Sequence, residues 1–418
     1  MTYACLFLLP WQTRWIFHES VLLGQTFEYG KLSIYLVEVL LLFAWLVRGK
    51  ILLPTQIKNL ILNKWAILFF ISLFFSLIFS VAPLISLVFL FHLFFAILIL
   101  FLLLDERLSF NTILLSFVLG LVIPSFLGIF QTVTGTSPAS TLFGLSIKEA
   151  IATGISVIEA GGVRLLRAYG SFPHPNIFGG YLAIGLLFLF FLFLKTTRQR
   201  LKIILVLLTI ILASSLFLTF SRSAWLVFIL GLIVMFFLNL SERKYLIRKT
   251  WSFFLSGFLV ILSLVFIFYP FITTRLEGQS RLEQKSIEER FGGYQMFYQI
   301  LSKYPLFGTG PGAYTLALAK EQPDLPAWSY QPVHNSFILF LAETGIISSL
   351  VLFLFILSFF KNRQVFRIKQ LTFVLPMIIF IFTLSLFDHY LWSLWPGIGL
   401  LAVLLGFCFK LLLSIDKK

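Results

Sequence analysis

Long apolar segments separated by short polar connectors run along almost the whole chain. A helix needs about 20 apolar residues to cross the hydrocarbon core of a bilayer, and segments of this length recur here. We interpret about twelve of them as transmembrane helices, of which the first is short. In chain order the predicted spans are 3–17, 31–47, 64–80, 84–104, 110–133, 176–195, 201–218, 222–240, 251–270, 335–360, 370–387 and 391–413.

The composition agrees with this pattern. Hydrophobic residues make up 59% of the 418 residues, Phe alone occurs 52 times, and only 12% of the residues are charged. Soluble globular domains are about 25% charged, so an ordinary soluble protein is excluded. The sequence therefore predicts an all-α, polytopic membrane protein.

Positive charge alternates from one connector to the next. The connectors on one side account for the whole formal net charge of +15. The positive-inside rule places these connectors, and both termini with them, in the cytoplasm. Anionic lipid headgroups explain their charge, so we expect membrane lipids as partners and no nucleic acid. The connectors on this side are 48–64, 105–107, 195–202, 242–249, 361–369 and 410–418.

The two ends of the chain carry little further information. The first apolar segment contains Arg14 and lacks a small-residue cleavage site, so we expect it to remain as a short first helix. Cys5 and Cys408 lie in apolar segments near opposite ends, which leaves no disulfide framework and no thiolate metal site.

Two outer connectors, 134–175 and 271–334, are much longer than the others. Long loops carry function more often than tight turns do. Within the larger loop, apolar residues recur at spacings of three and four over 281–303, which predicts an amphipathic helix on the membrane surface or over a cavity. We expect one membrane domain, 1–418, with an extracytoplasmic cap built from these two loops.

A turn-rich segment with Gly308, Gly310 and Gly312 follows the amphipathic helix. It superficially resembles a nucleotide-binding loop, but no strand–turn–helix unit surrounds it. We interpret it as a turn whose backbone approaches the substrate or the membrane closely.

Arg222 is the most unusual basic residue. With Ser221 it opens a predicted helix at the outer side, where the positive-inside rule disfavours an arginine. It either extends to lipid phosphate or binds an anion inside the bundle, and we favour the anion. Ser221 would cap the helix, whose N-terminus adds affinity for phosphate. Two or three arginines neutralise a pyrophosphate without a metal.

Other basic, imidazole and amide side chains reach the same outer level from separate segments. They are Arg164, Arg167, His174 and Asn176 from the end of the first long loop, Arg290 from the amphipathic helix, and His334 with Asn335 from the start of the helix 335–360. The sequence predicts that Arg222, Arg290 and His334 meet in one external cavity.

His334 is the candidate for proton transfer, because imidazole titrates near neutral pH and takes a proton from a sugar hydroxyl. The alternative is a side chain that only hydrogen-bonds loop backbone at the start of its helix. For His174 we favour a structural role at a helix entry. For Asp388 and His389 we favour a structural role in a tight outer turn.

The remaining charged residues in apolar segments are interpreted as structural. We expect ion pairs for Arg14, Glu38 and Glu343, with partners that the sequence does not identify. His18 and His92 are assigned no functional role. The outer carboxylates are scattered, so the sequence predicts no metal and no other cofactor.

Four stretches in this order resemble the O-antigen ligase and polymerase superfamily. They are RAYGSFPHPN from Arg167 to Asn176, TFSRSA from Thr219 to Ala224, YPLFGTGPGAY from Tyr304 to Tyr314 with Arg290 ahead of it, and HNSFILFLAETG from His334 to Gly345.

The resemblance implies a GT-C-type glycosyltransferase of the bacterial cytoplasmic (inner) membrane, with an extracytoplasmic active site and no metal. Its donor would be a glycan on a polyprenyl pyrophosphate such as undecaprenyl pyrophosphate. Arg222 and Arg290 would bind the pyrophosphate, and His334 would activate the acceptor hydroxyl. Arg167 would support them, and less directly Arg164.

We therefore predict a ligase that transfers a glycan to a hydroxyl of a lipid, protein or glycan acceptor. One base and fixed arginines fit direct displacement with inversion, whereas double displacement needs two carboxylates about 5 Å apart. A polymerase that joins repeat units uses the same donor chemistry and is the alternative. A transporter or flippase of lipid-linked glycans is the alternative from another class, although the sequence lacks the inverted repeats usual for it.

Overall fold

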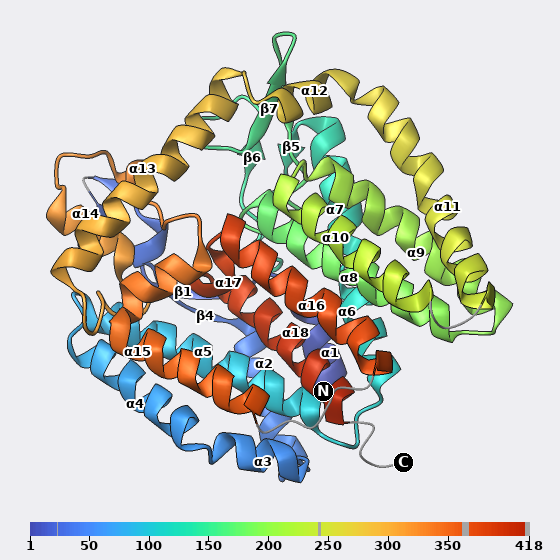
Figure 1. Cartoon of the computed structure of the whole chain (residues 1–418). Helices are drawn as coiled ribbons and strands as arrows, with labels where there is room; N and C mark the ends of the chain where they lie inside the picture. Colours follow the sequence, from blue (N-terminus) through green and yellow to red (C-terminus); the bar gives the residue numbers. More distant parts are fainter. Residues whose placement is uncertain (23, 241–243, 362–367, 414–418) are drawn as a thin grey trace. The chain divides into compact units, whose positions relative to one another are not determined.

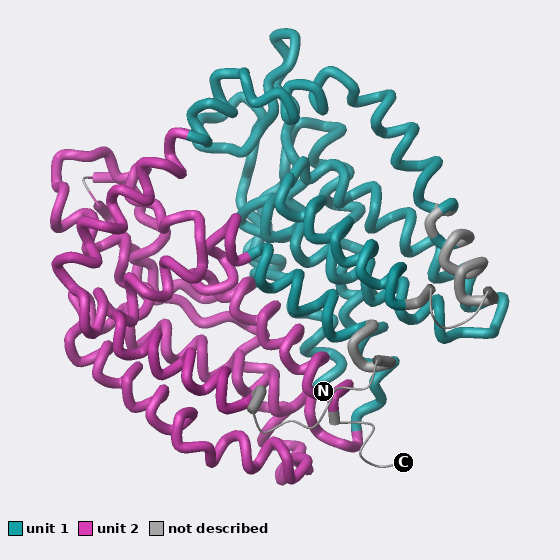
Figure 2. The backbone as a smooth tube through the Cα atoms, in the orientation of Figure 1, with its two compact units in different colours: residues 1–13, 108–287, 367–384 teal, residues 14–107, 288–366, 385–418 magenta. Residues whose placement is uncertain are grey.

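The computed structural model describes residues 1–22, 24–240, 244–361 and 368–413. Helices account for 70% of the described residues, whose strands form four two-stranded antiparallel sheets (Figure 1). The chain divides into two compact units. Unit 1 comprises residues 1–13, 108–287 and 367–384, and unit 2 comprises residues 14–107, 288–366 and 385–418 (Figure 2).

Unit 1 is a helical bundle with two β-hairpins. Its helices are α1 (Thr2–Leu8), α6 (Phe110–Gly120), α7 (Val122–Thr134), α8 (Pro175–Lys195), α9 (Gln199–Leu218), α10 (Arg222–Leu240), α11 (Lys244–Ile267), α12 (Tyr269–Glu277), the start of α13 (Arg281–Lys303) and most of α16 (Ile368–Phe387). Its strands β5 (Thr136–Ser137) and β6 (Lys148–Glu149) pair with each other, as do β7 (Val157–Ala160) and β8 (Val163–Leu166).

Helix α8 forms the core of unit 1. It is apolar on all sides and almost entirely buried, as expected for a helix enclosed by others. Helices α6, α9, α10 and α11 pack around it. At Gly179 the absence of a side chain lets α10 approach, because a Cβ there would lie 2.8 Å from the Cβ of Ala224. The first turn of α10, which carries Arg222, is thereby held against α8.

Unit 2 combines long helices with two short strand pairs. Its helices are α2 (Leu36–Arg48), α3 (Thr55–Ile61), α4 (Lys64–Ile78), α5 (Pro83–Leu104), the rest of α13, α14 (Tyr314–Glu321), α15 (Ser336–Lys361), α17 (Tyr390–Ser393) and α18 (Trp395–Leu413), with 3-10 turns η1 (Glu28–Gly30) and η2 (Ala327–Ser329). Strand β1 (Arg14–His18) pairs with β4 (Leu32–Tyr35), and β2 (Val21–Leu22) with β3 (Gln25–Thr26). Helix α5 packs on α18, and α4 on α15.

Helix α15 is broken at Gly345, where φ is 74° and ψ is 177°. The backbone groups freed at the break bond to the turn-rich segment that follows α13. The amide of Ile346 donates to the carbonyl of Pro305 at 2.9 Å, and the amide of Gly310 donates to the carbonyl of Glu343 at 2.9 Å. Non-helical backbone at membrane depth requires such internal partners. This segment therefore packs its backbone against the broken helix.

Six described helices are long and apolar enough to cross a membrane, and the number rises to eight if each of two bent pairs forms one span. The six agree with the predicted spans 84–104, 110–133, 176–195, 201–218, 335–360 and 391–413. The bent pairs fall on the predicted spans 64–80 and 251–270, and shorter apolar helices on 222–240 and 370–387. The prediction of twelve full spans is therefore confirmed only in part.

Two of the predicted helices are wrong as drawn from the sequence. Over 3–17, α1 ends at Leu8 and residues from Arg14 onward form strand β1. Over 31–47, strand β4 precedes α2, which has only 13 residues. Pairing between β1 and β4 competes with helix formation in both segments, and apolar length alone does not reveal it.

The predicted amphipathic helix is present as α13. Only part of its predicted apolar face lies in the core of unit 2. Phe297 is buried there and Tyr294 and Leu301 pack against it, whereas Phe291 and Tyr298 are 69% and 70% exposed. The first long loop holds the hairpins β5–β6 and β7–β8.

The expected ion pairs of the apolar segments form in two of three cases. Arg14 pairs with Glu28. Glu38 pairs with His92, to which the sequence assigned no role, with Oε1 2.5 Å from Nδ1. Among the described residues, the partners of the Glu343 carboxylate are N–H groups and not a cation.

Replacing Gly345 with Ala should destabilise the fold. The added Cβ would overlap the carbonyl of Leu306 and lie 2.6 Å from the amide nitrogen of Gly308, at a φ that L residues rarely adopt. We expect a loss of roughly 3 kcal/mol in the free energy of unfolding, measured as a lower thermal midpoint in detergent. Gly49→Ala is the matched control, because φ is +66° but nothing lies within 4 Å of the added Cβ. Equal losses in both variants would contradict the proposed packing at the break.

Candidate functional site

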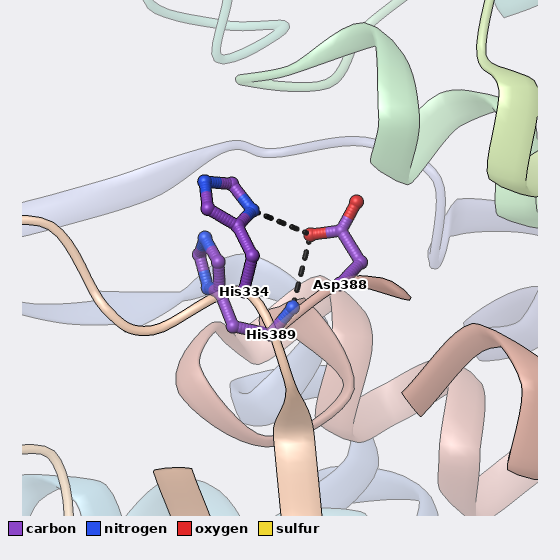
Figure 3. Close-up of side chains that lie close together, drawn as sticks. All are labelled: His334, Asp388 and His389. Carbon is purple, nitrogen blue, oxygen red and sulfur yellow. Dashed lines mark hydrogen bonds and ion pairs between the residues drawn. The ribbon is translucent and has the colours of Figure 1, made fainter. Parts of the chain in front are cut away.

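In unit 2, three side chains that can transfer a proton or bind a metal lie together at the start of α15 and in the turn before α17 (Figure 3). The Nδ1 atom of His334 faces Oδ1 of Asp388 at 4.0 Å. The rings of His334 and His389 lie 5.1 Å apart at 65°. Asp388 is 4% exposed, and its Oδ1 also accepts a hydrogen bond from the amide of His389 at 3.0 Å. We call His334, Asp388 and His389 the His–Asp cluster.

Hydrogen bonds from the first residues of α15 hold this turn. Asn335 caps α15, because its Oδ1 accepts from the amides of Phe337 and Ile338 at 3.0 and 3.1 Å. Its Nδ2 donates to the carbonyl of Leu386 at 3.4 Å. Ser336 Oγ donates to the carbonyl of Asp388 at 2.8 Å. The same short segment thus carries His334 and fixes the carboxylate beside it.

A second set of hydrogen bonds involves Trp392, which lies about one helical turn after His389. The indole Nε1 of Trp392 in α17 donates to Oε2 of Glu343 at 2.7 Å, and the amide of Gly312 donates to the same oxygen at 2.8 Å. A buried carboxylate that accepts several N–H groups is well satisfied. Glu343 therefore ties the glycine-rich segment to the helix that follows His389.

The electrostatics of the His–Asp cluster favour neutral imidazoles. Burial lowers the pKa of His334, and Arg290 lowers it further, although Asp388 opposes both. Burial and then the neighbouring His334 lower the pKa of His389 to about 4. At neutral pH each ring therefore keeps one nitrogen with a free lone pair.

Arg290, from the part of α13 that belongs to unit 2, is the cation that acts on His334. Its Nε is buried and has no hydrogen-bond partner among the described residues. The structure thus brings together two of the three residues predicted to share a cavity.

The third predicted residue, Arg222, lies in unit 1 in a cluster of arginines around the turn 219–222. Phe220 in this turn has a φ of 47°, a conformation that costs a non-glycine residue about 1–3 kcal/mol. Arg167 is 6% exposed and donates from Nε to the carbonyl of Thr219 at 2.7 Å. Arg275 donates from Nε to the carbonyl of Phe220 at 3.0 Å. Two consecutive carbonyls of the turn therefore each hold a guanidinium.

Arg222 and Arg275 share one buried carboxylate. Nη2 of Arg222 lies 3.2 Å from Oε2 of Glu283, and Arg275 forms an ion pair with Oε1. Nη1 of Arg222 also donates to the carbonyl of Arg275 at 3.3 Å. The side chain of Arg222 is 31% exposed, whereas that of Glu283 is 4% exposed. A single negative charge thus faces two guanidinium groups.

The other polar residues that the sequence places at the outer level from the first loop have identifiable structural contacts. Asn176 accepts a hydrogen bond from Nη2 of Arg167 at 2.7 Å. His174 caps α8 by accepting from the amide of Asn176 at 3.1 Å, and its Nε2 lies 3.0 Å from Ser156 Oγ. Arg164 pairs with Glu159 across the β7–β8 hairpin at 3.2 Å.

Ser221 contacts its own helix as the sequence predicts. Its Oγ accepts from the amide of Ala224 at 3.4 Å, the contact of an N-terminal cap. Because Arg222 belongs to unit 1 and Arg290 and His334 belong to unit 2, the meeting of all three stays a prediction.

Sequence reasoning assigned no functional role to four residues of these clusters, and for Asp388 and His389 it favoured a structural role in a tight turn. Asp388 and His389 follow the apolar segment 370–387 on the side predicted for His334, and this shared side was the available signal. Arg275 and Glu283 lie in a loop of mixed charge in which no spacing distinguishes them. The three atoms that His334, Asp388 and His389 offer as ligands lie within 4.8 Å of one another, so this cluster also has the donor set of a metal site.

Several helices of spanning length are typical of a multi-pass membrane protein. Its arginine cluster and its histidine–carboxylate pair are of the residue types that enzymes use for anion binding and proton transfer. Residues 207–353 match the family model described as O-antigen ligase, which supports the resemblance to the O-antigen ligase superfamily that the motifs predict. This match indicates a membrane glycosyltransferase of ligase or polymerase type. No curated protein matches the chain.

The matched region contains Arg222, Arg290 and His334. Arg167 precedes it, and Asp388 and His389 follow it. The contacts of the His–Asp cluster therefore extend beyond the segment that the family comparison covers.

Replacing Arg275 with Met should destabilise unit 1 by about 3 kcal/mol, because it leaves a buried carboxylate with one guanidinium fewer and a carbonyl unpaired. Thermal unfolding in detergent measures the effect. Arg281→Met is the matched control, because the Arg281 side chain is 76% exposed in its ion pair with Glu159 and such pairs contribute less than about 1 kcal/mol. A loss as small as that of the control would show that Arg275 does not stabilise the arginine cluster.

Proposed function

We propose that the protein is a glycosyltransferase of the O-antigen ligase type. It transfers a glycan from a polyprenyl pyrophosphate, such as undecaprenyl pyrophosphate, to a hydroxyl of a lipid, protein or glycan acceptor. The observation that carries the proposal is the position of the His334 imidazole, with the carboxylate of Asp388 facing its Nδ1 and Arg290 acting on its charge, in a region that matches the O-antigen ligase family model.

The proposed role of Asp388 is to select the tautomer of His334. A carboxylate beside Nδ1 favours the form in which Nδ1 carries the proton and Nε2 keeps its lone pair. At 4.0 Å the two atoms are beyond hydrogen-bond distance, and contacts of this kind often tighten when substrate binds. A small rotation of the His334 side chain, whose Nδ1 has no hydrogen-bond partner among the described residues, brings them together.

In the proposed reaction, Nε2 of His334 takes the proton of the acceptor hydroxyl as its oxygen attacks the anomeric carbon. The bond from this oxygen to the anomeric carbon forms while the bond from the carbon to the pyrophosphate oxygen breaks. The polyprenyl pyrophosphate leaves with the electron pair. The reaction needs one base, and with a single displacement it inverts the anomeric configuration.

The arginines would stabilise the leaving group. Preorganised cations placed where charge develops supply much of the rate in such reactions. Arg222 and Arg290 bind the pyrophosphate in this proposal, and Arg167 supports Arg222 by holding the turn before α10. Arg275 also pairs with Glu283, so in this proposal Arg222 exchanges its contact with this carboxylate for contacts with phosphate oxygens. The N-terminus of α10 adds its own attraction for an anion.

The orientation in the membrane is part of the proposal. We assign the basic connectors and both termini to the cytoplasm by the positive-inside rule, and the protein to the bacterial inner membrane as a GT-C-type transferase. The clusters at His334 and Arg222 then face the extracytoplasmic side. No metal takes part in the transfer.

Replacing His334 with Ala should reduce glycan transfer by at least about 10²-fold, because the loss of a general base typically costs 10²–10⁴-fold. Donor binding should persist, whereas Arg222→Ala should weaken both binding and transfer. Transfer from a labelled lipid-linked donor in proteoliposomes measures both. His18→Ala, which removes an exposed imidazole from β1, is the control. If His334→Ala transferred normally while Arg222→Ala did not, proton transfer by His334 would be wrong and anion binding would stand.

The size of the product should distinguish the ligase from the polymerase. A radiolabelled lipid-linked donor incubated with candidate acceptors should give a single attachment of the complete glycan to each acceptor. Gel electrophoresis separates this product from a ladder of repeat units, which would assign the polymerase reaction instead. Donor that only changes membrane side, with no new glycosidic bond, would identify a transporter.

A further inference from the structure

The His–Asp cluster has the composition of a transition-metal site. Two imidazoles and one carboxylate offer ligand atoms no more than 4.8 Å from one another. A tetrahedral zinc ion with bonds of about 2.0–2.2 Å brings its ligands to roughly 3.3 Å from one another. The movement required is therefore small, and Figure 3 shows the two rings beside each other with the carboxylate facing the ring of His334.

Each of the three groups offers one ligand atom. Nδ1 of His334 is buried and has no hydrogen-bond partner among the described residues. His389 engages Ser393 Oγ through Nδ1 at 2.7 Å, so we assign metal binding to its Nε2. Metal-binding histidines usually have such a second partner on the other ring nitrogen, because it fixes the ring orientation. Asp388, fixed through its carbonyl by Ser336, supplies a carboxylate oxygen.

We propose that His334, Asp388 and His389 bind one Zn²⁺ ion, with a water molecule in the fourth position, and that the bound ion inhibits the enzyme. Inhibition rests on the proposed function of His334 as the base, whereas metal binding does not. Imidazole and carboxylate ligands suit Zn²⁺, while Mg²⁺ requires octahedral oxygen coordination and binds poorly to such a set.

The inhibition follows from the chemistry of the ring. A neutral imidazole has one proton and one free lone pair. When Zn²⁺ takes the lone pair of Nδ1, the proton lies on Nε2, which is the atom that must accept the proton of the acceptor hydroxyl. The ion also engages the carboxylate of Asp388, which then no longer selects the tautomer. A metal in this cluster therefore converts the base into a group that cannot act as one.

Direct binding to the purified full-length protein in detergent tests the proposal. Titration of Zn²⁺ against a fluorescent chelator should give one ion per chain. His389→Ala and Asp388→Asn should weaken binding at least about tenfold, and His18→Ala should bind as the wild type does. X-ray absorption at the zinc edge on the wild-type protein should show two imidazole ligands, which tests the site without any variant. No stoichiometric binding, unchanged affinity in His389→Ala, or a spectrum without imidazole would overturn the site.

A transfer assay separates the site from its effect. Zn²⁺ should abolish transfer in the wild type, a chelator should restore it, and Mg²⁺ should leave it unchanged. Undiminished transfer with the cluster occupied by Zn²⁺ would refute inhibition. If the metal-free protein transferred no glycan at all, the proposed function would fail, while the binding result would still decide the metal site.

Discussion

The break in α15 at Gly345 is the constraint on which the rest of unit 2 depends. A helix interrupted at membrane depth leaves amides and carbonyls that only protein can satisfy. The segment from Pro305 to Gly310 satisfies them with its own backbone, and Glu343 beside the break accepts further N–H groups from Gly312 and Trp392. Because Trp392 follows His389 closely, its hydrogen bond to Glu343 beside the break also fixes the position of the turn that carries Asp388 and His389.

The same principle acts separately in unit 1. The turn between α9 and α10 is strained at Phe220, where φ is 47°. Arg167 and Arg275 donate to the carbonyls of Thr219 and Phe220, and these hydrogen bonds help to stabilise the strained turn. In unit 1 a turn between two helices, and in unit 2 a break within one helix, present backbone groups to which polar side chains or other backbone groups bond. Charged and titratable side chains lie where the regular hydrogen bonding of the helix stops.

The sequence predicts the parts of the fold that apolar length alone determines. Helices α5, α8 and α18 were predicted nearly to their ends, because each is a continuous apolar run of spanning length. Arg14 lies in an equally apolar run, yet it belongs to a strand, since pairing with Tyr35 across β1 and β4 depends on a partner outside the run. The buried position of α8 was likewise hidden, because lipid-facing and protein-facing apolar helices have the same composition.

The sequence predicts those residues of the candidate site whose type is rare at its position in an apolar segment. Arg222 and His334 attract attention because an arginine or a histidine is rare at the outer end of an apolar helix. Asp388 is a candidate site residue only because it lies beside His334, which is more than fifty residues earlier in the chain. Glu283 is one of several acidic residues in its loop, and its burial between Arg222 and Arg275 is a tertiary fact.

The separation of His334 from Asp388 along the chain has a consequence for biosynthesis. Membrane proteins are threaded into the bilayer from the N-terminus as translation proceeds, so α15 is inserted with its histidine while the carboxylate is still within the ribosome. The pair is completed only after α16, which Asp388 follows directly, has been inserted. A nascent or truncated polypeptide that ends before Asp388 therefore lacks the carboxylate that faces Nδ1 of His334.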